Sequence, residues 1–169
     1  PEAARSKPIF TNRYLANHQD LNRYFTADPD DQSDVAIRAR KIVKAVAEVT
    51  PEAVLDLHNT SGVSPAFGVA VAEDDNTLDL VSFFTDKLIL TGLHVGAIME
   101  MDFKAPIATI ECGGASDIYS HQVATDGLHE FFTRNNIFDR HANRVQVHRH
   151  PIRVELVGDA SVGFSHHGL

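Results

Sequence analysis

The sequence predicts an α/β protein with a central, mostly parallel or mixed β-sheet, helices on both faces of the sheet, and the start of a β unit at the C-terminus. Two sequence patterns predict this fold. Short apolar runs rich in β-branched residues, typical of strands, alternate with longer segments whose apolar residues recur at helical spacing. Composition is the third observation. The 169 residues, 43% apolar and 22% charged, suffice for one core and exclude collagen, coiled coil and a disordered chain.

The first elements are predicted from caps and apolar runs. A helix is expected over 34–49, where Ser33 or Asp34 caps its start and a Thr-Pro pair ends it. The apolar run 53–57 predicts a buried strand, because its length and β-branched content fit one. This strand is expected to deliver His58 into a loop at its C-terminal end.

The remaining elements follow the same alternation. Strands are predicted at 67–72, 95–99 and 107–112, and helices at 76–90 and 117–135. Residues 144–156 alternate apolar and polar side chains, which predicts a hairpin belonging to a separate β unit. We therefore expect a partial α/β domain in residues 1–140 and the start of a β-rich segment in residues 141–169.

Charge and cysteine content exclude several classes of partner. The net charge is −8 and no block of basic residues occurs, which argues against nucleic acid and against an anionic membrane surface. No apolar stretch approaches the roughly 20 residues that cross a bilayer, so no membrane span is expected. A single cysteine, Cys112, and the lack of a signal-peptide pattern predict a cytoplasmic protein. The chain opens on Pro1, as expected of a piece of a longer protein, although methionine removal or a tag scar would also produce it.

Two predicted strands end in side chains that can do chemistry. In open α/β sheets the functional site lies beyond the carboxyl ends of the strands. His58 follows one strand, beside Asp56, and suits a metal-ligating imidazole held by a further hydrogen bond. Glu111 lies in an apolar strand, where an ionised carboxylate needs a partner charge, a metal or a solvated cleft, and there it would serve as a general base. An ordinary loop histidine, one of ten in the chain, and a solvent-facing carboxylate remain the alternatives.

Two arginines near the N-terminus each have an asparagine beside them. Arg13 follows Asn12, and Arg23 follows Asn22, in mostly polar and non-helical stretches. A guanidinium group presents a planar fork that suits a carboxylate or a developing oxyanion, and asparagine adds a neutral donor. Loop arginines held in salt bridges would give the same pattern.

Three segments follow one another along the chain: Asp-Leu-Asn-Arg-x-Phe at 20–25, Asp-Leu-His-Asn-Thr at 56–60 and Glu-Cys-Gly at 111–113. Together, in this order and at these separations, they resemble the aspartoacylase and succinylglutamate desuccinylase family, which is related to the zinc carboxypeptidases. The resemblance covers residues 13–138. It implies a zinc carboxypeptidase-like fold, one zinc ion held by a His-x-x-Glu pair and a later histidine, and hydrolysis of an amide that joins an acyl group to an amino acid or a related amine.

The resemblance also implies a role for each candidate residue. His58 matches the third zinc ligand, and Glu111 matches the glutamate that takes a proton from the attacking water and passes it to the leaving amine. Asn22 and Arg23 match the pair that clamps a substrate carboxylate. Arg13 matches the arginine that polarises the scissile carbonyl and stabilises the tetrahedral oxyanion. The expected partner is thus a small, carboxylate-bearing amide.

The chain departs from the family pattern because it contains no His-x-x-Glu sequence, so two of the three zinc ligands are expected upstream of Pro1. We predict a zinc-dependent deacylase, represented here by an incomplete catalytic domain that binds zinc poorly by itself. The alternative is a non-catalytic binding or assembly module that keeps the carboxylate clamp on the same fold. The sequence leaves open the acyl group, the amine and whether the chain forms a homo-oligomer.

Overall fold

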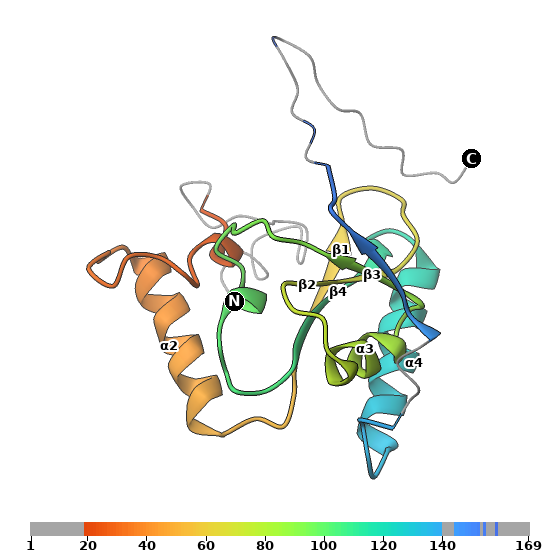
Figure 1. The fold of residues 1–169 in the computed structure, drawn as a ribbon. Helices are drawn as coiled ribbons and strands as arrows, with labels where there is room; N and C mark the ends of the chain where they lie inside the picture. Colours follow the sequence, from red (N-terminus) through yellow and green to blue (C-terminus); the bar gives the residue numbers. More distant parts are fainter. Residues whose placement is uncertain (1–18, 140–143, 153, 155–157, 159–169) are drawn as a thin grey trace. The chain divides into compact units, whose positions relative to one another are not determined.

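The structure, a computed structural model, describes residues 19–139, 144–152, 154 and 158 (Figure 1). The chain divides into two compact units. Among the described residues, the helical unit comprises 19–51 and 94–104, and the sheet unit comprises 52–93 and the described residues from 105 onward. The predicted domain boundary near residue 140 stays a prediction, because residues 140–143 lie outside the described part of the chain.

A five-stranded mixed sheet is the frame of the sheet unit. In spatial order its strands are β1 (Val54–Thr60), β4 (Ile107–Gly114), β2 (Phe67–Ala70), β3 (Lys87–Leu90) and β5 (Gln146–Arg149). The β1–β4, β2–β3 and β3–β5 pairs are parallel, and β2 runs antiparallel to β4. The predicted α/β class with a mostly parallel or mixed sheet is therefore confirmed.

Two helices of the sheet unit pack on one face of this sheet (Figure 1). They are α3 (Asp75–Ser82) and α4 (Ile118–Thr133), and both contact β4. Successive side chains of a strand alternate between the two faces. Ala108, Ile110 and Cys112 therefore share the face that joins Leu80 of α3 in the buried core. The odd-numbered residues of β4 lie on the opposite face.

Each helix begins at a side chain that accepts a hydrogen bond from the first turn. Ser33 caps α2 (Asp34–Glu48) in the helical unit, as the sequence predicts. Asp74 accepts a hydrogen bond from the Thr77 N–H at the start of α3, and Asp117 accepts one from the Tyr119 N–H at the start of α4. Such caps satisfy backbone donors that have no partner within the helix. No helix in the described part of the chain combines the length and hydropathy needed to span a bilayer.

Replacing Gly127 with alanine is expected to lower the free energy of unfolding by about 1–2 kcal/mol. A Cβ atom at this position of α4 would lie 2.2 Å from Cδ1 of Phe84, whose ring is buried. Overpacking of this kind costs about 1–3 kcal/mol, and an approach this short places the cost in the upper part of that range. The roughly 1 kcal/mol that alanine gains over glycine inside a helix offsets only part of it. Denaturant unfolding measures the change. Gly92→Ala is the matched control, because its Cβ would meet nothing within 4 Å, and equal effects of both changes would contradict the packing argument.

One predicted helix is wrong over its second half. The segment 76–90 was expected to be a single helix, but α3 ends at Ser82 and residues 87–90 form β3. The apolar residues of 87–90 continue the helical spacing, so the pattern of that segment cannot separate the two structures. Pairing with β2 on one side and β5 on the other decides for a strand, because it buries Leu88 completely.

Two further expectations also differ from the structure. Residues 95–99 are not a strand, because they form a loop that ends in the short 3-10 helix η2 (Ile98–Glu100) of the helical unit. The tail was expected to form a hairpin in a separate β unit, but its residues 146–149 pair in parallel with β3 and form an edge strand of the central sheet. Most of residues 153–156 lie outside the described part of the chain.

Candidate active site

His58 and Glu111 lie side by side on neighbouring strands. Their Cα atoms are partners in the parallel β1–β4 pair. Partners on adjacent strands lie about 4.8 Å apart across the sheet, and in register they point to the same face. Their neighbours Leu57 and Ile110 pack toward the helices, so His58 and Glu111 occupy the opposite face. The structure thus brings together these two sequence-predicted residues.

The imidazole of His58 is held by a carboxylate. Its Nε2–H donates to Oδ2 of Asp56 at 2.8 Å, and the Thr109 hydroxyl donates to the same oxygen at 3.2 Å. The side chains of His58 and Asp56 are 33% and 21% exposed, so most of their surface is shielded from solvent but a ligand can still contact them. A neutral ring that donates through Nε2 carries its lone pair on Nδ1, which is how carboxylates commonly orient metal-ligating histidines.

His58 lies within a strand, which corrects the expectation that it begins a loop. β1 continues through Thr60, and the register between β1 and β4 shifts after the His58–Glu111 pair. Gly113, two residues beyond Glu111, has a φ of +112°, a conformation that L side chains rarely adopt. The Asn59 amide donates to its carbonyl at 3.1 Å. This irregularity redirects β4 directly after Glu111, as β-bulges near active sites often do.

Glu111 and Cys112 point to opposite faces and differ in their chemistry. The Glu111 side chain is partly buried, and its Oε2 atom is shielded from solvent. Cys112 is buried in the core between the sheet and the helices. Burial, together with the nearby charge of Glu111, raises the pKa of the Cys112 thiol above its ordinary value. The thiol is therefore protonated at neutral pH and is a core residue rather than a nucleophile.

Asn22 and Arg23 lie together in η1 (Leu21–Arg23) of the helical unit. The Asp20 carboxylate caps this turn by accepting a hydrogen bond from the Asn22 N–H at 3.0 Å. The Asn22 Oδ1 accepts one from the Ile98 N–H at 3.1 Å, which ties the turn to η2. Arg23 is exposed, and its Nη1 donates to the Asn22 carbonyl at 2.6 Å. Among the described residues, no carboxylate forms an ion pair with Arg23. Arg13 lies outside the described residues.

A buried carboxylate organises the loop that holds Asn22. The Glu100 side chain is 3% exposed, and its Oε1 accepts hydrogen bonds from two backbone N–H groups. Burial by itself raises the pKa of Glu100, but backbone donors outweigh burial and bring the pKa below its ordinary value. These donors are the N–H groups of Ala97, Val95 and Gly96, joined by the imidazole of His94. The charged form of Glu100 therefore stabilises the loop that positions Ile98.

Replacing Glu100 with glutamine is expected to lower the free energy of unfolding by about 1–2 kcal/mol at neutral pH, because hydrogen bonds to a charged group are lost. A lowered folded-state pKa gives stability that is fully present above the unfolded pKa near 4.5 and is lost as pH falls through the folded pKa. The difference between the two proteins should therefore shrink as the pH falls below about 4.5. Denaturant unfolding across this pH range tests it. Glu52→Gln, at an exposed glutamate, serves as control, and a pH-independent difference would refute the assignment.

Sequence reasoning missed residues that support the candidate side chains within each of the two units. Thr109, two residues before Glu111, lies on the same face and donates to Asp56. Its place two positions before Glu111 in a strand was the signal that could have identified it. Glu100 carries no sequence signal, because its role depends on the fold of the loop. Across the part of the chain that the structure describes, no three His, Cys, Asp or Glu side chains group closely enough to hold a metal ion. The neutral imidazole of His58, held by Asp56, has the chemistry of a single metal ligand.

No family model and no curated protein matches the sequence. Solved structures, in contrast, match the fold over most of the chain. A succinylglutamate desuccinylase from Chromobacterium violaceum matches 87% of this chain with a TM-score of 0.63 and 17% identity. One from Vibrio parahaemolyticus matches 88% with a TM-score of 0.65 and 15% identity. A succinylglutamate desuccinylase/aspartoacylase from Rhodobacter sphaeroides matches 70% with a TM-score of 0.56 and 16% identity.

These structures carry the names of the family that the three sequence segments resemble, and at these identities they establish a shared fold. The chain spans about half the length of the first two, 55% and 49%, and 38% of the third. The fold predicted from the resemblance is therefore confirmed.

Proposed function

We propose that this chain is part of a zinc-dependent deacylase that hydrolyses the amide bond of an N-acyl amino acid or a related amide. The observation that carries the proposal is the pairing of His58 with Glu111 on one face of the sheet, with Asp56 behind the imidazole. The shared fold supports it, because the matching structures are named as desuccinylases and an aspartoacylase. Fold alone does not determine activity, so the site residues carry the argument.

Glu111 is the proposed proton carrier. It lies beside His58, the proposed metal ligand. A water bound at this place would be within reach of the Glu111 carboxylate. Glu111 would take a proton from this water and pass it to the nitrogen of the leaving amine. The hydrogen bond from the Asn59 amide to the Gly113 carbonyl fixes the backbone conformation at the end of β4, directly after Glu111. General base catalysis depends on such fixed placement.

His58 is the proposed zinc ligand contributed by this chain, through Nδ1. Asp56, supported by the Thr109 hydroxyl, would hold the ring in the required tautomer and orientation. A bound zinc ion supplies Lewis acidity at the scissile carbonyl and the attacking water. A catalytic zinc site uses three protein ligands, so this proposal places the remaining two in a His-x-x-Glu pair outside the 169 residues.

Asn22 and Arg23 are the proposed binding pair for a substrate carboxylate. Arg23 presents an exposed guanidinium, and Asn22 is fixed by its hydrogen bond from Ile98. The planar guanidinium fork matches the geometry of a carboxylate. Arg13, which resembles the oxyanion-stabilising arginine of the family, would act on the tetrahedral intermediate.

The proposal is tested on the natural full-length protein with a panel of N-acyl amino acids. Release of free amine and zinc content per chain are measured together. We expect hydrolysis that a chelator abolishes and added zinc restores. A protein that binds N-acyl amino acids but holds no stoichiometric zinc and hydrolyses none of them would overturn the proposal and would favour the non-catalytic module.

Replacing Asp56 with asparagine is expected to weaken zinc binding about 10–100-fold. The imidazole loses the charged acceptor that orients it, although the asparagine carbonyl can still accept a hydrogen bond. A chelator competition titration gives the zinc dissociation constant. Asp126→Asn, at an exposed position of α4, is the matched control. Unchanged zinc affinity in Asp56→Asn would remove Asp56 from the proposed site.

A further inference from the structure

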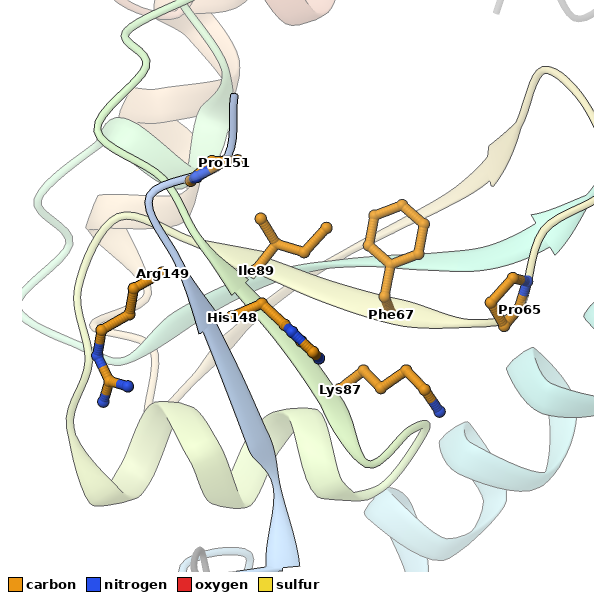
Figure 2. A pocket seen from close by; sticks show the side chains of 7 residues that line it. All are labelled: Pro65, Phe67, Lys87, Ile89, His148, Arg149 and Pro151. Carbon is orange, nitrogen blue, oxygen red and sulfur yellow. The ribbon is translucent and has the colours of Figure 1, made fainter. Parts of the chain in front are cut away.

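A cavity of about 280 Å³ lies in the sheet unit, over β2, β3 and β5 (Figure 2). Its walls are almost entirely apolar. It is lined by Pro65, Phe67, Lys87, Ile89, His148, Arg149 and Pro151. Figure 2 shows the Phe67 ring and the Ile89 side chain projecting from neighbouring strands to the same side. The volume is slightly below the range of about 300–1,000 Å³ that holds whole drug-sized ligands, so it has room for one short chain or one ring.

The cavity lies on the face of the sheet that carries His58 and Glu111. Phe67 is the Cα partner of Glu111 in the β2–β4 pair. One row further along, Thr109 pairs with Val69, Val69 with Ile89, and Ile89 with His148. Cα partners on neighbouring strands point to the same face. These two rows of partners therefore lead from the candidate site across the sheet into the cavity. With strands about 4.8 Å apart, Phe67 is next to Glu111, and Ile89 follows one strand beyond β2.

The cations at the rim of the cavity already have carboxylate partners. Lys87 Nζ lies 2.7 Å from Oδ1 of Asp86. Arg149 forms a two-point ion pair with Glu73, with Nε donating to Oε2 at 3.0 Å. These pairs neutralise the positive charges of Lys87 and Arg149. The remaining lining is the imidazole of His148 and the apolar side chains of Phe67, Ile89 and two prolines. An uncharged apolar group therefore fits the cavity better than an ionised one, which would lose its hydration without gaining a partner.

We propose that this cavity is a specificity subsite that binds an uncharged aliphatic or aromatic group of the substrate, placed beside the reacting amide by its position next to Glu111. The inference rests on the proposed deacylase function and adds to it a substrate class. The group that enters is either the acyl chain or the side chain of the amine, because both flank the same amide bond.

Binding measured by ¹H–¹⁵N NMR titration tests the subsite without relying on turnover. One arm compares N-acetylglycine with N-hexanoylglycine, and the other compares N-acetylalanine with N-acetylnorleucine. We expect the longer member of one pair to bind more tightly by about fourfold for each buried methylene, with the largest shifts at the amides of Phe67 and Ile89. The pair that responds identifies which side of the amide enters the cavity. Equal affinities within both pairs would overturn the proposal.

Two matched truncations locate the effect. Ile89→Ala shortens a side chain that lines the cavity. Val69→Ala shortens the Cα partner of Ile89, which lies on the same face but does not line the cavity. We expect Ile89→Ala to reduce the preference for the longer ligand about tenfold and Val69→Ala to leave it unchanged. The milder Ile89→Val gives a smaller loss in the same direction if Ile89→Ala unfolds. The same loss in both truncations would show that the ligand binds elsewhere.

Turnover separates this inference from the function on which it rests. In the natural full-length protein, the ratio of kcat/KM for the longer over the shorter substrate should fall in Ile89→Ala and not in Val69→Ala. Hydrolysis of all substrates without a length preference would overturn the subsite alone. Absence of hydrolysis with binding at the cavity intact would overturn the deacylase proposal, and would leave the cavity as a binding site for an apolar group.

Discussion

Replacing Glu111 with glutamine is expected to lower kcat/KM for hydrolysis of an N-acyl amino acid by about a hundredfold to ten-thousandfold, the usual contribution of a general acid–base group. Glutamine keeps the size of the side chain but cannot take a proton from water or return it to the leaving nitrogen. Because the glutamine side chain fills the same space beside His58 as the glutamate does, the β1–β4 pair should keep its register. Steady-state kinetics and zinc content of the natural full-length protein measure the effect.

The control for this change is Glu48→Gln, at an exposed glutamate near the end of α2 whose Lys44 partner is also exposed. Surface pairs of this kind contribute little, so activity should stay within about twofold of the unchanged protein. We expect Glu111→Gln to retain zinc and to lose turnover in kcat. Activity that persists in Glu111→Gln would assign the proton transfer to another group.

Replacing His58 with alanine is expected to remove zinc and activity together. A catalytic zinc ion depends on three protein ligands, and loss of one ligand weakens binding by more than the about 10–100-fold expected for an outer hydrogen-bond partner. Zinc per chain after dialysis, and the zinc dissociation constant by chelator competition, measure the loss. High zinc concentrations should restore little activity, because the site lacks a ligand rather than an orienting partner.

His129→Ala is the control for His58→Ala, because His129 is exposed on α4. It should bind zinc as the unchanged protein does. The comparison with Asp56→Asn separates two roles, since the ligand variant should lose zinc altogether and the orienting variant should regain occupancy at higher zinc. Full zinc occupancy in His58→Ala would exclude His58 as a ligand and would remove the main support for a zinc-dependent reaction.

Local sequence patterns were sufficient for the elements that carry their own signals. Ser33 and Asp117 cap helices that begin where the sequence indicates. The core strands β1 and β4 were found from short apolar runs, although both extend further than predicted. β3 was missed because its four residues continue the spacing of the preceding helix, and only pairing on both sides makes them a strand. A pattern in one segment carries no information about its partners.

The sequence by itself determined the α/β class, the Ser33 cap of α2, and the three segments whose resemblance points to a deacylase. Only the tertiary structure decided that His58 and Glu111, far apart along the chain, are Cα partners with Asp56 and Thr109 beside them. It also decided that an apolar cavity continues their face of the sheet through Phe67 and Ile89. The physical reason is that strand order and register are set by burial of the whole sheet against its helices, which no single segment of the chain can encode.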